Sequence, residues 1–173
     1  MRISLNLVFF LMINALTATY AVGDVSFEVS GGPIYAWPEE EGFDGAGGAM
    51  LRAKLYTPIV DVEVVPTYFG EFDADDASDT YLEASALSIG VGKDIELTHW
   101  LSVYGHLGIS YWYAELVFID EKRGDDDGIG SWAGLGLNAN INDLIHFYTG
   151  YQRHFDVSGS DINVLLVQAG VEF

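Results

Sequence analysis

The sequence predicts an all-β fold, an eight-stranded antiparallel up-and-down β-barrel that crosses a membrane. Three observations lead to this prediction. Apolar and polar residues alternate with period two, the connections are alternately long and short, and aromatic residues lie near both ends of the apolar face. Such alternation is typical of strands with one apolar and one polar face. Together the three features favour a transmembrane barrel, whose wall faces lipid.

The start of the chain has the pattern of a cleaved secretory signal. A short positive start precedes a mostly apolar stretch from Leu5 to Leu16, and small residues at Thr19 and Ala21 precede a cleavage site. The expected domains are therefore a signal peptide at residues 1–21 and the barrel at residues 22–173. A buried N-terminal helix is the alternative for the first segment. No apolar run long enough for a transmembrane helix follows the signal.

Eight segments of the mature chain alternate in this way. They are expected at residues 24–37, 45–56, 59–70, 80–92, 100–117, 129–140, 144–155 and 162–173. Taken one per segment in order, apolar-face residues are Val29, Leu51, Val62, Ile89, Ile109, Leu135, Phe147 and Val167. Polar-face residues are Glu28, Arg52, Glu63, Gly90, His106, Trp132, His146 and Gln168. In a small barrel the polar face points inward, and interior glycines leave room for large rings.

The connections differ in length in a regular way. The odd-numbered ones are long and acidic, at residues 38–44, 71–79, 119–128 and 156–161. The even-numbered ones, at residues 57–58, 93–99 and 141–143, are mostly short. Transmembrane barrels have long loops outside the cell and short turns in the periplasm. Because the number of strands is even, both chain ends are expected in the periplasm and the acidic loops outside.

The second hairpin predicts an interior network of paired charges. A two-residue turn at 57–58 would set Lys54 opposite Asp61, and the same register would set Arg52 opposite Glu63. Opposite charges facing each other across strands are stabilising, and charges buried inside a barrel must be paired. The predicted network consists of Arg52, Lys54, Asp61, Glu63, Glu28 and Glu172.

The last strand, residues 167–173, carries a recognisable motif. It alternates apolar residues and ends in an aromatic residue, with Gln168, Gly170, Val171 and Phe173 as its key positions. It resembles the C-terminal signal that the barrel-assembly machinery reads in outer-membrane proteins. Residues 22–173 resemble, in pattern and length, the OmpA-like and OmpX/Ail-like group of small eight-stranded Gram-negative outer-membrane barrels. The resemblance implies an outer-membrane location, with membrane lipid, lipopolysaccharide and the assembly machinery as partners.

Composition excludes several other classes of protein. The chain has 26 acidic residues, 7 lysines and arginines, and a formal net charge of -19. A nucleic-acid partner is therefore not expected, since phosphate binding needs a basic face. The chain has no cysteine, so disulfides and thiolate metal sites are excluded. We expect no cofactor and a monomeric protein.

Some barrels of this size are lipid A 3-O-deacylases, which carry a histidine and a serine two residues apart. Here His154 and Ser158 are four residues apart, so the motif fails and no enzyme is expected. His154 is predicted at the outer rim. His106 and His146 are expected inside the barrel as hydrogen-bonded side chains rather than metal ligands.

The acidic loops are the candidate interaction sites. Their residues are Glu39, Glu40, Glu41, Asp73, Asp75, Asp76, Asp79, Asp125, Asp126 and Asp127. They could contact host surface molecules, or share divalent cations with lipopolysaccharide. Arg153, expected to point outward at the outer rim, is the candidate contact for lipopolysaccharide phosphate.

The sequence thus predicts a non-enzymatic surface barrel that serves envelope integrity or adhesion. A narrow ion-conducting pore, gated by the paired interior charges, is the main alternative. A lipid A-modifying enzyme and a soluble barrel of the lipocalin kind are further alternatives.

Overall fold

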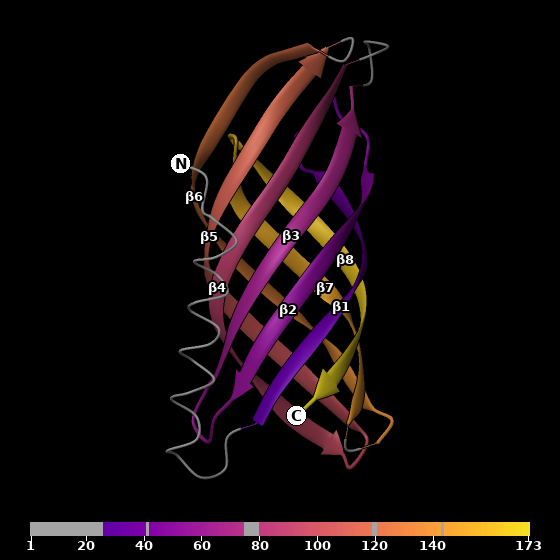
Figure 1. Cartoon of the computed structure of the whole chain (residues 1–173). Helices are drawn as coiled ribbons and strands as arrows, with labels where there is room; N and C mark the ends of the chain where they lie inside the picture. Colours follow the sequence, from indigo (N-terminus) through magenta and orange to yellow (C-terminus); the bar gives the residue numbers. More distant parts are fainter. Residues whose placement is uncertain (1–25, 41, 75–79, 119–120, 143) are drawn as a thin grey trace.

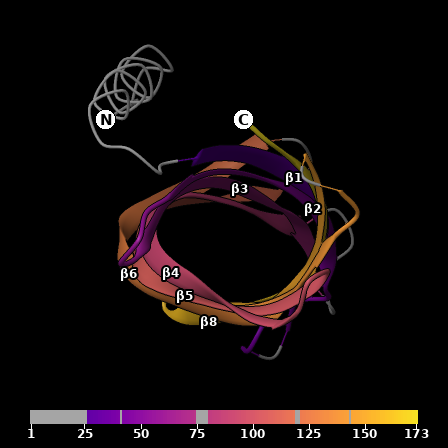
Figure 2. The same cartoon turned by 90° about the horizontal axis from the view of Figure 1, so that it is seen from below.

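The chain folds as a closed ring of antiparallel strands. The computed structural model describes residues 26–40, 42–74, 80–118, 121–142 and 144–173. Each strand pairs with the next along the chain, and the last pairs with the first (Figures 1 and 2). The eight strands are β1 (Ser26–Pro38), β2 (Ala46–Tyr56), β3 (Asp61–Asp73), β4 (Thr80–Thr98), β5 (Leu101–Phe118), β6 (Glu121–Asn140), β7 (Ile145–Val157) and β8 (Ser160–Glu172). No helix in the described part of the chain has the length and apolar character needed to cross a membrane.

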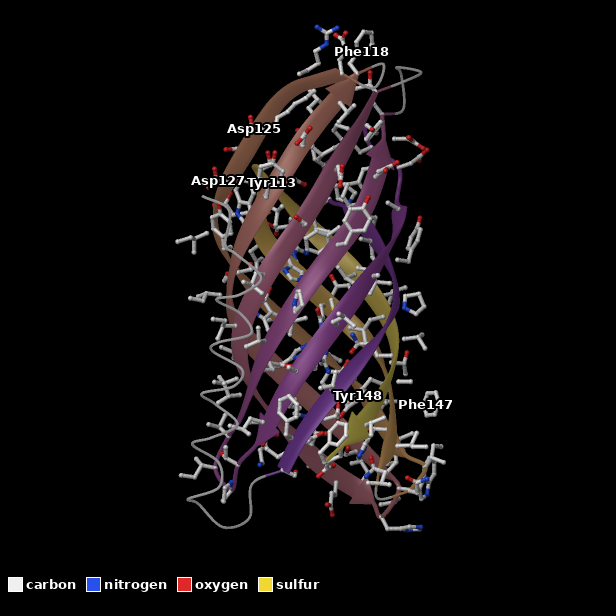
Figure 3. The ribbon with its side chains drawn as sticks, in the orientation of Figure 1. Tyr113, Phe118, Asp125, Asp127, Phe147 and Tyr148 are labelled. Atoms are coloured by element: carbon white, nitrogen blue, oxygen red, sulfur yellow. The ribbon has the colours of Figure 1, made fainter. Side chains whose placement is uncertain are left out.

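The predicted outer and inner faces of the barrel wall are confirmed. Phe147 points away from the barrel and its neighbour Tyr148 points into it (Figure 3). Leu51 and Ile109 are exposed on the outside, whereas residues one position away in the same strands, such as Arg52, are buried inside. Successive side chains of a strand point to opposite faces, so the period-two pattern assigned these residues to the correct face.

Several strands extend beyond the bounds that the sequence predicted. β3 continues to Asp73, β4 to Thr98 and β7 to Val157. β6 begins early, at Glu121, and β8 at Ser160. The expectation of long loops at 119–128 and 156–161, and of a connection at 93–99, was therefore wrong. Residues 121–128 lack a clear apolar face, and pairing with β5 orders them, whereas in β4 the alternation continues with Ile95 and Leu97 on the outside. The connection between β7 and β8 is a tight turn in which Gly159 has a φ of 84°.

The register between β2 and β3 also differs from the prediction. Lys54 pairs with Glu63, two positions from the predicted partner Asp61. The turn is longer than two residues, since the Thr57 hydroxyl donates to Val60 O at 2.5 Å and accepts from Val60 N at 3.2 Å. A two-residue shift keeps every side chain on its face, so the interior residues stayed interior.

The interior is divided into two zones. The half nearer the outer loops is packed with apolar side chains, among them Ile34, Met50, Val65, Phe69, Phe72, Trp112, Ile162, Val164 and Leu166. The half nearer the chain ends holds the charged residues. Met50 and Arg52 are successive inward residues of β2, and the boundary between the zones falls there.

Candidate functional site

Arg52 lies at the centre of the interior charge network. Its Nε atom is 3.2 Å from Glu63 Oε2, and Glu63 Oε1 is 2.9 Å from His106 Nδ1. The guanidinium also lies 5.3 Å and 5.4 Å from the ring centres of Tyr104 and Tyr148. A carboxylate and the faces of two aromatic rings therefore compensate this buried cation.

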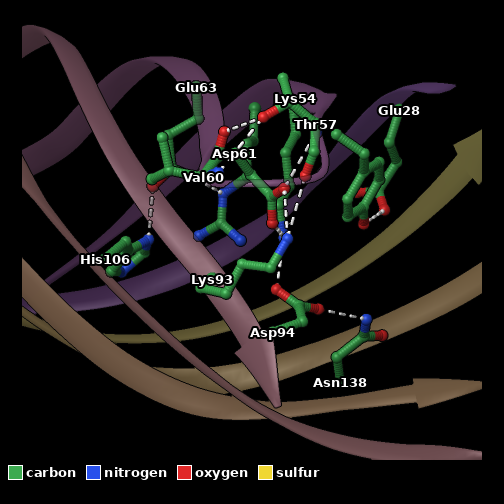
Figure 4. A network of polar contacts seen from close by, with 12 residues as sticks. Glu28, Lys54, Thr57, Val60, Asp61, Glu63, Lys93, Asp94, His106 and Asn138 are labelled. Carbon is green, nitrogen blue, oxygen red and sulfur yellow. Dashed lines mark hydrogen bonds and ion pairs between the residues drawn. The ribbon is translucent and has the colours of Figure 1, made fainter. Parts of the chain in front are cut away.

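Lys54 forms the second part of the network (Figure 4). Its Nζ atom is 2.5 Å from Asp94 Oδ1 and 3.7 Å from Asp61 Oδ2. Lys93 Nζ, at the mouth of the barrel, is 3.3 Å from Asp61 Oδ1. Asn138 Nδ2 donates to Asp94 Oδ2 at 3.0 Å, so the contacts cross the barrel from β2 to β6.

Glu28 and Glu172 face each other across the β1–β8 seam, as predicted. Glu28 accepts hydrogen bonds from the hydroxyls of Tyr56, at 2.7 Å, and Tyr148. Glu172 Oε2 lies 3.1 Å from His146 Nε2. The two glutamates thus contact tyrosine and histidine side chains and not the predicted cations.

Four members of the network were predicted from the sequence, and others were not. The structure brings together Arg52, Lys54, Asp61 and Glu63, as predicted. Partners that were not predicted include Asp94, Asn138, Tyr56, Tyr148 and Lys93. For Asp94 a signal existed, since it continues the inward alternation of Gly90 and Gly92, but the fourth strand was expected to end there.

His154 is buried rather than at the rim, contrary to the prediction. Its ring stacks on Trp132 at a centroid distance of 5.9 Å and meets the edge of Phe69 at 4.9 Å. β7 continues to Val157, so His154 lies within the wall and points inward. Ser158 lies in the turn, and its hydroxyl donates to Asp126 at 3.4 Å.

The C-terminal positions lie at the periplasmic end of the seam. Gln168 is buried, Val171 is exposed, and Phe173 is 75 % exposed. Gly170 lies beside Ser30 and Glu28. The main chains of Phe27 and Phe173 hydrogen-bond to each other in both directions. Recognition by the assembly machinery stays a prediction.

Arg153 points outward at the outer rim but is already engaged. It donates to Asp161 Oδ2 from Nε at 3.0 Å and from a terminal nitrogen at 2.6 Å, and it also donates to Glu39. Two carboxylates therefore occupy the donors that were predicted to bind phosphate. Contact with lipopolysaccharide stays a prediction.

The acidic candidate residues that the structure describes do not gather at one site. Asp125, Asp126 and Asp127 belong to the β5–β6 hairpin, on which Figure 3 labels Asp125 and Asp127. Asp127 accepts a hydrogen bond from Tyr111 at 2.8 Å. Asp73 ends β3, and Glu39 and Glu40 follow β1. Glu41, Asp75, Asp76 and Asp79 lie outside the described residues. Within the described ranges, no group of three or more acidic, histidine or cysteine residues is arranged to hold a metal ion.

The fold and the polar interior define a small outer-membrane β-barrel, and comparison with known proteins agrees. Residues 48–164 match the family of OmpA-like transmembrane domains. The chain belongs to this family, and its location is the outer membrane. No curated protein matches it significantly.

Solved structures share the fold at low sequence identity. Neisserial surface protein A has a TM-score of 0.65 and 14% identity, covering 86% of this chain and 97% of its own. OprG from Pseudomonas aeruginosa has a TM-score of 0.64 and 13% identity, covering 86% and 95%. Ail, the attachment invasion locus protein of Yersinia pestis, has a TM-score of 0.60 and 16% identity, covering 86% and 98%.

Proposed function

We propose that this chain is a non-enzymatic surface barrel that binds partners outside the cell through its extracellular end. The observation that carries this proposal is the filled interior. An apolar layer packs the outer half of the barrel, and a paired charge network fills the periplasmic half. Because the wall faces lipid and the interior is closed, the extracellular end is the surface left for recognition.

The filled interior argues against the alternative of a pore. An ion entering from outside would have to displace Phe69, Phe72 and Met50, which are at most 1 % exposed. Transfer of an ion into such an apolar layer costs far more than thermal energy. An ion from the periplasm would have to break the contacts of Arg52 and Lys54 first.

The charge of the extracellular end favours cationic partners. Acidic residues on this side include Glu39, Glu40, Asp73, Glu115, Glu121, Asp125, Asp126, Asp127 and Asp161. One Ail structure holds a heparin analogue, sucrose octasulfate. A polyanion of that kind would be repelled here, so we expect a partner of opposite charge, either a basic protein surface or a divalent cation.

In this proposal, two sequence motifs direct the export and the assembly of the chain. Residues 1–21 direct secretion, and the segment with Gln168, Gly170, Val171 and Phe173 addresses the chain to the barrel-assembly machinery. Cleavage after Ala21 would leave Val22 as the first residue of the mature protein, which N-terminal sequencing would measure.

A hairpin-shortened variant tests the proposed function. Residues 114–126 are replaced by Asn-Gly, which favours a tight turn between Tyr113 and Asp127. We expect Gram-negative cells with the full-length protein to adhere to surfaces coated with basic protein, and cells with the shortened hairpin to adhere no better than cells without the barrel.

Two further measurements distinguish the proposed function from a pore and from a role in envelope integrity. Purified barrels in a planar bilayer should give no steady conductance, and stepwise currents through most barrels would contradict the closed interior. The full-length and the hairpin-shortened protein are also expressed in cells without the barrel, and resistance to detergent is measured. If both proteins raise this resistance equally and neither supports adhesion, the barrel serves envelope integrity and the adhesion proposal is wrong.

A further inference from the structure

The periplasmic half of the interior holds more carboxylates than cations. Among the described residues, its cations are Arg52, Lys54 and Lys93, and its carboxylates are Glu28, Asp61, Glu63, Asp94 and Glu172. The three cations contact Glu63, Asp94 and Asp61. Lys54 is directly opposite Glu28 across β1 and β2, but its Nζ atom lies 2.5 Å from Asp94 Oδ1. Glu28 and Glu172 are therefore left without a lysine or arginine partner.

These two glutamates lie at the seam that closes the barrel, where the last strand pairs with the first. Glu28 on β1 is directly opposite Glu172 on β8, and both side chains lie on the inner face. Like charges directly opposite each other across two strands are destabilising. Glu172 has His146 as a neighbour at 3.1 Å, whereas none of the described histidines contacts Glu28.

Glu28 is the more deeply buried of the two. It is 0 % exposed, whereas the Glu172 side chain is 27 % exposed. Glu28 Oε1 has no hydrogen-bond partner among the described residues and lies beside Gly170 of β8. Burial of an ionised carboxylate without a cation is costly, and a bound proton removes the charge.

The contacts of the other carboxyl oxygen indicate a place for such a proton. Glu28 Oε2 and the hydroxyls of Tyr56 and Tyr148 each contact the other two, and the hydroxyl oxygens are 2.9 Å apart. A tyrosine hydroxyl has one hydrogen to donate, and a carboxylate has none. With Glu28 ionised, both hydroxyls donate to it and no hydrogen is left for the contact between them. With Glu28 protonated, each of the three oxygens has one hydrogen to donate.

We propose that Glu28 carries a proton at neutral pH, and that this proton is a pH-sensitive latch on the periplasmic end of the β1–β8 seam. The charged and titratable side chains around it are Lys54, Tyr56, Asp94, His146, Tyr148 and Glu172.

Loss of the proton sets two carboxylates opposite each other, beside the main-chain hydrogen bonds between Phe27 and Phe173 that end the seam. The pairing of the last strand with the first then weakens. The folded barrel holds a proton that the unfolded chain releases at neutral pH. Stability is therefore greatest in acid and decreases as the pH rises and Glu28 ionises.

Infrared spectroscopy of the purified mature barrel in an ester-free neutral detergent tests the inference, because a protonated carboxyl and a carboxylate absorb at different frequencies. We expect a protonated-carboxyl band at neutral pH that disappears when the pH is raised. The band should be absent in Glu28→Gln. It should be retained in Glu96→Gln, the matched control, because Glu96 is an exposed carboxylate at the same end of the barrel.

Urea-induced unfolding measures the effect on stability. We expect the midpoint urea concentration of the wild type to fall from mildly acidic to mildly alkaline pH. The midpoint of Glu28→Gln should fall by less than half as much, because the amide has no charge to gain, and Glu96→Gln should follow the wild type. Glu172→Gln removes the opposing carboxylate and should also reduce the fall, so the latch is tested by a second variant. Heat-modifiable mobility on a denaturing gel confirms that each variant is folded.

Three results would overturn the inference. The first is a neutral-pH spectrum without a protonated-carboxyl band, and the second is a band that Glu28→Gln leaves unchanged, which would assign the proton to another acid. The third is a midpoint whose dependence on pH is the same in the wild type, Glu28→Gln and Glu172→Gln, which would mean that the proton does not act on the seam.

Discussion

Arg52 shows how this small barrel accommodates charge in its interior. The residue is 1 % exposed, and it contacts Glu63 and the faces of two tyrosine rings. An ion buried without such partners costs several kcal/mol. The carboxylate comes from β3, which pairs directly with β2, whereas the rings come from β5 and β7 and reach Arg52 only when the barrel closes.

Glu63→Gln should destabilise the barrel strongly. The amide keeps the shape of the side chain but leaves the Arg52 cation without its carboxylate, at a cost of about 3–5 kcal/mol. Urea-induced unfolding in lipid vesicles, followed by tryptophan fluorescence, measures this loss. Glu115→Gln is the control, because Glu115 contacts Lys122 at the exposed hairpin, where an ion pair contributes little to stability, and its loss should be much smaller. Equal losses in the two variants would contradict the assigned role of Arg52 and Glu63.

At the scale of single elements, β3 contains an irregularity that period two does not explain. Phe69 and Phe72 both point inward, although they are three residues apart. The register shifts between Tyr68 and Gly70, and Gly70 has a φ of 109°. A bulge of this kind inserts one residue and exchanges the faces beyond it, so Phe72 joins the apolar layer and Glu71 points out.

Gly70→Ala should destabilise the barrel, because φ is in the left-handed region and the new Cβ would lie 2.5 Å from Gly47 O. We expect a loss of about 1–3 kcal/mol in the same unfolding measurement. Gly47→Ala is the matched control, since its Cβ would meet no atom within 4 Å. Unchanged stability of Gly70→Ala would mean that the bulge has no conformational requirement for glycine.

The sequence predicted the number of strands and their faces, but not all of their lengths. The third strand was expected to end at Gly70, where the bulge breaks the alternation. The start of β6, with Asp125 to Asp127 in it, was expected to be a loop, because a strand exposed on both faces shows no apolar period. Its order comes from pairing with β5, which single-strand patterns do not reveal.

At the scale of the whole molecule, closure of the sheet brings side chains from different strands together in the interior. The predicted pairs of Arg52 with Glu63 and Lys54 with Asp61 exist, although the register was wrong by two residues, because long side chains reach diagonal neighbours. Contacts across the barrel, such as Asn138 with Asp94, depend on its curvature and could not be predicted from sequence.

We propose that the chain crosses the outer membrane with the β5–β6 hairpin outside and the short turns in the periplasm. Because the natural chain has no cysteine, a single introduced one reports its own side of the membrane. Gly124→Cys lies on the hairpin, and Ile59→Cys lies in the exposed turn between β2 and β3. A membrane-impermeant maleimide should label Gly124→Cys on intact cells, and Ile59→Cys only after the outer membrane is permeabilised. Labelling of Ile59→Cys on intact cells, with Gly124→Cys protected, would contradict this orientation of the barrel.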